Sequence, residues 1–84
     1  MNIYVGNLDF KVNEKDLEGL FEQFGIISSS RIITDKFNGR SKGFGFITME
    51  NQDEASKAIK ELDGTTLDDR KIVVNEAKPK RDNY

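Results

Sequence analysis

The chain has 84 residues, no cysteine and no histidine, and its 13 basic and 15 acidic residues give a formal net charge of −2. A chain of this length is expected to form one domain with one modest core. The two missing residue types exclude disulfides, thiolate or Ser-His catalysis, and cysteine- or histidine-based metal sites. No apolar run approaches the ~20 residues of a membrane span, and no secretory signal opens the chain. We therefore expect a soluble, cytoplasmic protein without metal or cofactor.

The first two expected elements are a short strand at residues 2–5 and a helix that begins after Asn13. In the strand, Tyr4 alternates with aliphatic residues. Asn13 is a good N-cap, and Gly25 is expected to be the C-cap glycine of the helix. Between them, apolar residues recur at the spacing of one buried helical stripe: Leu17, Leu20, Phe21 and Phe24.

The middle of the chain is expected to form two strands joined by a polar loop. The first strand covers residues 27–34, where alternation points Arg31 outward. The loop contains Asn38-Gly39, a strong turn signal. The second strand covers residues 43–49.

A second helix and a last strand complete the expected elements. Asn51 is expected to cap the helix, with Glu54 three residues later as in a capping box, and Gly64 to end it. A small hairpin is expected within residues 65–71, before a strand at residues 72–74. The apolar stripe of the second helix is Ala55, Ala58, Ile59 and Leu62.

The order strand, helix, strand, strand, helix, strand predicts a two-layer α+β sandwich with one sheet face open to solvent. Residues 1–78 would form the domain, and residues 79–84 a short polar tail that is expected to be mobile. The aliphatic strand positions that should face the helices are Ile3, Val5, Ile47, Met49, Ile72 and Val74. The opposite register would bury Lys71 and Asn75 under the helices, which is costly without polar partners.

This register leaves three aromatic side chains, those of Tyr4, Phe44 and Phe46, on the open face. Contiguous exposed apolar surface usually marks a binding site. Rings side by side, with Lys42 leading into the strand, suit the stacking of unpaired bases. Basic residues also gather around this strand although the whole chain is acidic, because the two expected helices hold most of the acids.

Two segments resemble the motifs of the RNA-recognition motif family. Lys42–Met49 is similar to the octamer motif of that family, and Ile3–Leu8 to its hexamer motif, about 40 residues earlier. The likeness covers residues 1–78. It implies a ferredoxin-like β-α-β-β-α-β fold: a four-stranded antiparallel sheet with both motif strands at its centre and two helices on one face. Met49 departs from the family pattern, which usually has an aromatic residue there, but alternation assigns this position to the helix side.

The resemblance implies single-stranded RNA as the partner and assigns three kinds of contact. Base and ribose stacking comes from aromatic rings, phosphate contacts from basic residues, and hydrogen bonds to base edges from polar groups near the ends of the strands. The stacking residues are Tyr4, Phe46 and Phe44, and the phosphate-contacting residues are Lys42, Arg31 and Arg40. The residues expected to bond to base edges are Asn7, Lys71, Asn75, Glu76, Ala77 and Lys78.

Alternative functions remain open. A protein-interaction module on the same fold would use the acidic helices, and single-stranded DNA could replace RNA because no residue clearly reads a 2′-hydroxyl. An enzyme is least favoured: the open face lacks a carboxylate pair, and Gly43-Phe44-Gly45 lies in a strand and does not open a helix as a phosphate loop would. We expect a monomeric RNA binder, a post-transcriptional regulator or RNA chaperone, and the compact form suggests bacterial origin.

Overall fold

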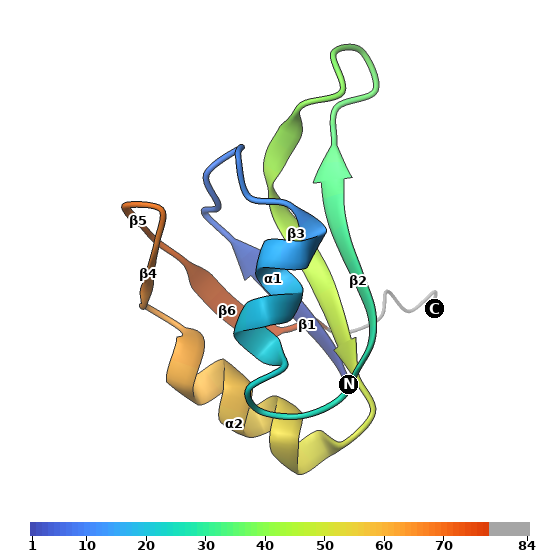
Figure 1. Ribbon diagram of the computed structural model, residues 1–84, viewed down its shortest axis with the longest axis vertical. Helices are drawn as coiled ribbons and strands as arrows, with labels where there is room; N and C mark the ends of the chain where they lie inside the picture. The colour runs from blue at the N-terminus through green and yellow to red at the C-terminus, as the bar shows by residue number, and fades with distance from the viewer. Residues whose placement is uncertain (78–84) are drawn as a thin grey trace, which may run out of the picture.

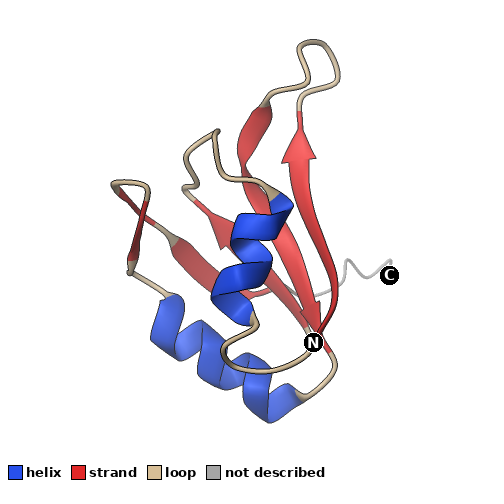
Figure 2. Cartoon of the chain, viewed as in Figure 1, coloured by secondary structure: helices blue, strands red, loops and turns tan. Residues whose placement is uncertain are grey.

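The computed structural model describes residues 1–77, which form a sheet and two helices that pack on one of its faces (Figures 1 and 2). The helices are α1 (Glu14–Phe21) and α2 (Gln52–Leu62). The strands of the sheet are β1 (Asn2–Gly6), β2 (Ile27–Thr34), β3 (Ser41–Met49) and β6 (Val73–Glu76). A separate two-stranded ribbon, β4 (Thr66–Leu67) and β5 (Arg70–Lys71), precedes β6. The expected order of elements is confirmed, and the tail at 79–84 lies outside the described residues.

The sheet is antiparallel, with strand order β2-β3-β1-β6. The two motif strands, β1 and β3, therefore lie at its centre, as the resemblance implied. Their register pairs Tyr4 with Phe46 and Ile3 with Ile47. Because a strand points successive side chains to opposite faces, one cross-strand pair is aromatic and the next is aliphatic.

The core lies between the helices and one face of the sheet. All six expected aliphatic strand positions are buried there, with exposures of 1% or less: Ile3, Val5, Ile47, Met49, Ile72 and Val74. Leu17 and Phe21 of α1 and Ala55 and Ala58 of α2 close the core from the other side. Burying each large apolar side chain stabilises the fold by about 1.5–3 kcal/mol, so this face holds most of the stabilising contacts.

Both expected N-caps are confirmed, but the capping box forms at α1 and not at α2. At α1, the Asn13 side chain accepts from the Asp16 N–H (2.9 Å), and the Asp16 carboxylate accepts from the Asn13 N–H (3.1 Å), which makes a full capping box. At α2, Asn51 accepts from the Glu54 N–H (3.0 Å), but the reciprocal bond from Glu54 is absent. The predicted capping box at α2 is therefore only half formed.

The prediction that Gly25 caps the end of α1 is wrong. The helix ends at Phe21, and the chain turns at once, with the Phe24 N–H donating to the Phe21 carbonyl (3.0 Å). Gly25 does not have a positive φ. A Cβ at Gly25 would overlap the side chain of Glu54, which lies in the first turn of α2. The glycine therefore lets the segment after α1 lie close to α2.

The connector after α2 is the small hairpin that the sequence predicted. Gly64, at φ 83°, ends the helix, and the two residues between β4 and β5, Asp68 and Asp69, have φ values of 49° and 66°. Two consecutive left-handed residues make a type I′ turn, which matches the twist of a two-residue hairpin.

Neither helix of residues 1–77 is long and apolar enough to cross a membrane.

A bulge in β2 changes which of its residues face the core. Ile27 pairs with Met49, but Ser29 pairs with Thr48, so Ser28 is an extra residue. Without this bulge, simple alternation would put Ile27 on the open face; with it, Ile27 packs against the core. Next to the bulge, the open face of β2 is consequently occupied by two polar residues, Ser29 and Arg31.

Candidate nucleic-acid interface

Three aromatic rings form the centre of the open sheet face. The ring centroids of Tyr4 and Phe44 are 5.9 Å apart, those of Tyr4 and Phe46 5.9 Å, and those of Phe44 and Phe46 6.1 Å. The interplanar angles are 33°, 62° and 88°, respectively, and all three side chains are half-buried. Aromatic pairs at these separations stabilise one another by about 0.5–1.5 kcal/mol. We call these three residues the ring triangle.

Glycines next to the rings have structural roles of their own. Gly6 follows Tyr4 on the same face, and a Cβ at Gly6 would overlap the Tyr4 ring, which leans over it. Gly45 points to the helix side, where a Cβ would overlap the main-chain oxygen of Arg31 on β2. Gly45 thus permits close approach of the neighbouring strand.

One row of residues crosses all four strands and contains two of the rings. Arg31 on β2 pairs with Phe46 on β3, Phe46 with Tyr4 on β1, and Tyr4 with Asn75 on β6. Arg31 and Asn75 are exposed. The row therefore presents a cation, two stacking surfaces and an amide in one line across the sheet.

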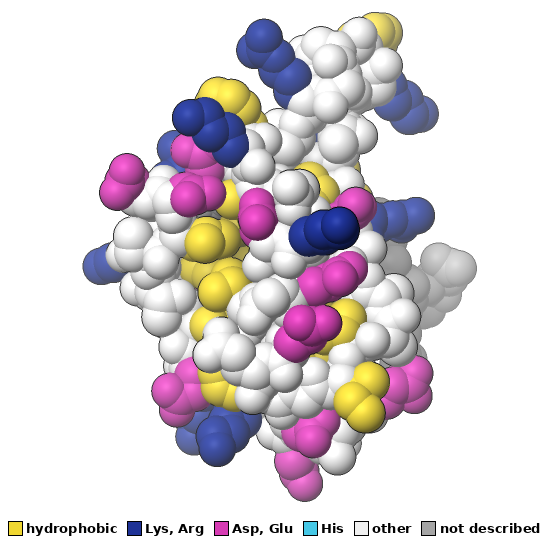
Figure 3. Space-filling model, in the orientation of Figure 1, with side chains coloured by type: hydrophobic (Ala, Val, Ile, Leu, Met, Phe, Trp, Pro, Cys, Tyr) yellow, Lys and Arg dark blue, Asp and Glu magenta, His cyan; other side chains and the backbone are white. Residues whose placement is uncertain are grey.

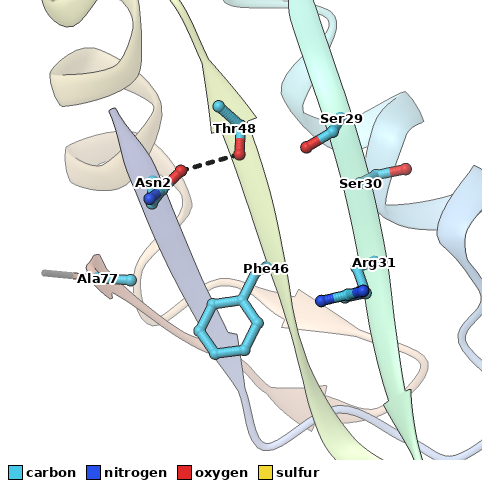
Figure 4. Close-up of a pocket in the computed structure, with 7 residues that line it drawn as sticks. All are labelled: Asn2, Ser29, Ser30, Arg31, Phe46, Thr48 and Ala77. Atoms are coloured by element: carbon cyan, nitrogen blue, oxygen red, sulfur yellow. Dashed lines mark hydrogen bonds between the residues drawn. The ribbon is translucent and has the colours of Figure 1, made fainter. Parts of the chain in front are cut away.

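A hollow of about 460 Å³ lies beside Phe46 (Figure 4), which is the member of the ring triangle that lines it. Arg31 and Phe46 lie at one end of it, and Asn2 and Thr48 at the other. The Thr48 hydroxyl donates to the Asn2 side-chain oxygen (2.9 Å). This bond fixes the orientation of the Asn2 side-chain amide. The Ala77 N–H donates to the Asn2 main-chain carbonyl (2.8 Å), so Ala77 reaches the rim of this hollow.

A second hollow, of about 400 Å³, lies beside the other two members of the ring triangle. Tyr4 and Phe44 line it together with Lys42 from the start of β3. Two residues that sequence reasoning missed, Phe10 and Arg70, complete its wall. Phe10 could have been found from the sequence, because this large apolar residue belongs to neither the helical stripe nor the strand alternation. Nothing in the sequence pattern pointed to Arg70.

Asn7 joins the end of β1 to the β4–β5 ribbon. Its side-chain Nδ2 donates to the Lys71 carbonyl (2.6 Å), and its Oδ1 accepts from Arg70 Nη2 (2.8 Å). The backbone of Asn7 is left-handed (φ 57°), which asparagine tolerates better than most residues. Asn7 therefore has a structural role besides the base contact expected of it.

The other residues expected in the site lie farther from the ring triangle. Arg40 is exposed in the loop between β2 and β3, and Lys71 lies in β5, outside the four-stranded sheet. Glu76 pairs with Ile3, so its register position belongs to the helix side of the sheet. Lys78 lies outside the described residues.

Acidic side chains lie over the helix side of the molecule (Figure 3). Two of them fix α1 to the edge strand: Glu14 accepts from the Ile32 N–H (3.1 Å), and Glu18 accepts from the Ser30 hydroxyl. Among residues 1–77, no three acidic side chains are grouped in a way that could hold a metal ion. The acids on α1 therefore have a demonstrable role in packing.

Comparison with known proteins agrees with this geometry. A family model described as "RNA recognition motif" matches residues 3–73. A 28 kDa chloroplast ribonucleoprotein of Nicotiana sylvestris is 46% identical over 98% of this chain, which spans only 30% of that relative. A putative RNA-binding protein, RbpA, of Synechocystis sp. is 42% identical over 95% of this chain and 79% of the relative.

Solved structures are similar throughout the chain. A crystal structure titled RNA binding protein PG1 has a TM-score of 0.92 at 49% identity, covering 98% of this chain and 99% of that one. A Sex-lethal protein–RNA complex has a TM-score of 0.89 at 30% identity, covering 96% of this chain and 48% of that one. Both share the two-layer ferredoxin-like α+β fold described above. The chain belongs to the RNA recognition motif family.

Proposed function

We propose that this chain binds single-stranded RNA on the open sheet face, without catalysis. The observation that carries the proposal is the ring triangle: three half-buried aromatic side chains in mutual contact on the two central strands. The relatives are named as RNA-binding proteins, and one similar structure is an RNA complex. Exposed rings on a sheet are the means by which unpaired bases are bound through stacking.

We assign the rings the roles that the family resemblance implies. Tyr4 and Phe46 each stack on one base, and Phe44 packs against riboses. Stacking contributes about 1–3 kcal/mol per base, so the two stacked bases supply a large part of a micromolar affinity, which corresponds to about −8 kcal/mol.

Polar contacts complete the proposed interface. Arg31 lies in the row of the rings, and Lys42 lines the second hollow, so both are within reach of phosphates of a strand on the triangle. Arg40 adds attraction from the loop. Base edges are contacted by a group around the ends of the strands: Asn7, Lys71, Asn75, Glu76, Ala77 and Lys78. Glu76 takes part through its main chain, because its register position belongs to the helix side.

A titration with short single-stranded RNA pools tests the proposal. The double variant Tyr4→Ala/Phe46→Ala is expected to lose most of the affinity, because it removes both base-stacking surfaces. Phe37→Ala is the matched control: it also removes a phenylalanine, but one that is 99% exposed and lines neither hollow. Unchanged binding by the double variant, or no binding by the unaltered protein, would refute the proposal.

The same titration separates RNA from the rival partners. A matched DNA pool tests whether the 2′-hydroxyl contributes, and we propose that RNA binds more tightly. A protein-interaction function would use the acidic helix side, but Glu14 and Glu18 there bond to β2, which supports a packing role for them. Chemical shift changes confined to the helices would favour that rival.

We further propose that the protein acts as a monomer in the bacterial cytoplasm, as a post-transcriptional regulator or RNA chaperone. The cyanobacterial relative, of which this chain spans 79%, supports a bacterial setting. The chloroplast relatives are about three times as long as the matched segment, so their whole-protein roles do not transfer directly.

A further inference from the structure

The hollow beside Tyr4 and Phe44 is not accounted for by the two bases that Tyr4 and Phe46 stack. Its outer wall is Phe10, a large side chain that is 65% exposed. The ring of Phe10 takes no part in the ring triangle and does not belong to the core. An exposed aromatic residue that shares a hollow with two proposed RNA-binding rings points to an extension of the same site.

The loop between β1 and α1 holds Phe10 outward. On either side of it, Leu8 and Val12 are buried, with exposures of 4% and 2%. Asp9 fixes the turn between them: its carboxylate accepts from the Lys11 N–H (2.9 Å), and its carbonyl accepts from the Val12 N–H (3.0 Å). The loop is thus anchored at both ends, and the ring of Phe10 is presented to the hollow at little further cost in ordering.

Two cations border the same hollow from different elements. Lys42 comes from β3, and Arg70 from the β4–β5 ribbon. The Arg70 guanidinium is held by Asn7, with Nε donating to the main-chain oxygen (3.3 Å) and Nη2 to the side-chain oxygen (2.8 Å). Arginine has five N–H donors, so a guanidinium held in this way still has donors for a phosphate.

The size and charge of the hollow suit a nucleotide. Its volume of about 400 Å³ lies within the usual range of small-molecule sites, about 300–1,000 Å³. Its lining residues include two cations, three aromatic rings and no acid. This combination matches a flat base joined to a phosphate, and it is continuous with the ring triangle through Tyr4 and Phe44.

We propose that this hollow binds one further nucleotide of the RNA strand, next to the base on Tyr4. The base packs on Phe10, and the phosphate lies between Lys42 and Arg70. The inference rests on the proposed function, because it extends the same strand by one position. It predicts a footprint one nucleotide longer than the ring triangle alone accounts for.

A length series of RNA pools, from two to six nucleotides, tests the inference by calorimetric titration. The unaltered protein is expected to gain affinity by about 5- to 150-fold, the effect of one stacked base, when the RNA becomes long enough to reach Phe10. Phe10→Ala is expected to lose that step and to bind the shorter RNAs unchanged. Phe37→Ala, the matched control, is expected to keep the step.

The series distinguishes failure of this inference from failure of the proposed function. If Phe10→Ala keeps the step, or weakens short and long RNAs equally, the additional site is refuted while RNA binding stands. If the unaltered protein binds no RNA of any length, the proposed function fails and this inference with it. Arg70→Gln provides an independent check: it should reduce the gain in affinity at the RNA length that reaches Phe10.

Discussion

The two faces of the sheet are built from the same strands and behave oppositely. On the helix face, Ile3 and Ile47 are fully buried and pack under the helices. On the open face, at the adjacent position of each strand, Tyr4 and Phe46 contact each other and are only half-buried. The alternation of β-strand side chains thus separates stabilising residues from proposed binding residues at single-residue resolution.

The largest effect is expected from Ile47→Ala, on the helix face. Truncating a buried isoleucine removes packing and leaves a cavity, which costs about 2–5 kcal/mol. Ile47 has an exposure of 0%. Urea unfolding should show this loss, while RNA affinity of the folded fraction should stay close to that of the unaltered protein.

The neighbouring substitution, Phe46→Ala, should have the opposite profile. It is expected to weaken RNA binding by about 1–3 kcal/mol, the contribution of one stacked base. Its effect on the free energy of unfolding should be smaller than that of Ile47→Ala, because the ring is only half-buried. If Phe46→Ala destabilised the fold as strongly as Ile47→Ala, the conclusion that one face stabilises the fold and the other binds RNA would be wrong.

Gly45→Ala tests the boundary between the two faces. The added methyl points to the helix side and overlaps the Arg31 carbonyl oxygen, so β2 must shift. Overpacking of this kind typically costs about 1–3 kcal/mol, measured by thermal or urea unfolding. Because Arg31 pairs with Phe46, RNA binding should weaken as well.

Gly19→Ala is the matched control for that substitution. Gly19 lies in α1, and a Cβ there meets nothing within 4 Å. Alanine in place of an exposed helical glycine is expected to stabilise the protein by about 0.8–1.0 kcal/mol. RNA binding should not change, since Gly19 lies on the helix side.

The smallest expected effect concerns salt. Neutralising one phosphate contact on a single strand changes the slope of log K against log salt concentration by about 0.7. Lys42→Gln should reduce the slope by about that amount, whereas Lys15→Gln, on the helix side, should leave it unchanged. Equal slopes for both variants would exclude Lys42 from phosphate contact.

Sequence alone predicted the register of the sheet because aliphatic positions alternate in β1 and β3, and because Lys71 and Asn75 flank the buried positions at β6. The prediction was less complete where geometry depends on local insertions. The bulge at Ser28 turns Ile27 toward the core, and no residue type in this segment predicts a bulge. The sequence predicts a helix cap at Gly25, but the absent Cβ of this glycine makes room for Glu54 of α2, a contact that local sequence does not encode.

The sequence likewise predicted part of the candidate site, its aromatic rings, but not Arg70. Tyr4, Phe44 and Phe46 followed from alternation and from the motifs. Arg70 could not be foreseen, since it reaches the site through Asn7, 63 residues earlier in the chain. Such a contact depends on how the β4–β5 ribbon closes over the end of β1, and periodicity carries no information about that.

The thinness of the molecule has a consequence for its acidic net charge. Its shortest extent is 20 Å, with acids on the helix side and Arg31, Lys42 and Arg70 on the other side or at its rim. At physiological salt the screening length is about 8 Å, so RNA at the open face is shielded from the acids behind it. At 0.01 M salt the screening length is about 30 Å, longer than the molecule is thick. There the helix acids repel RNA through the protein, and the gain in affinity on dilution of salt should level off.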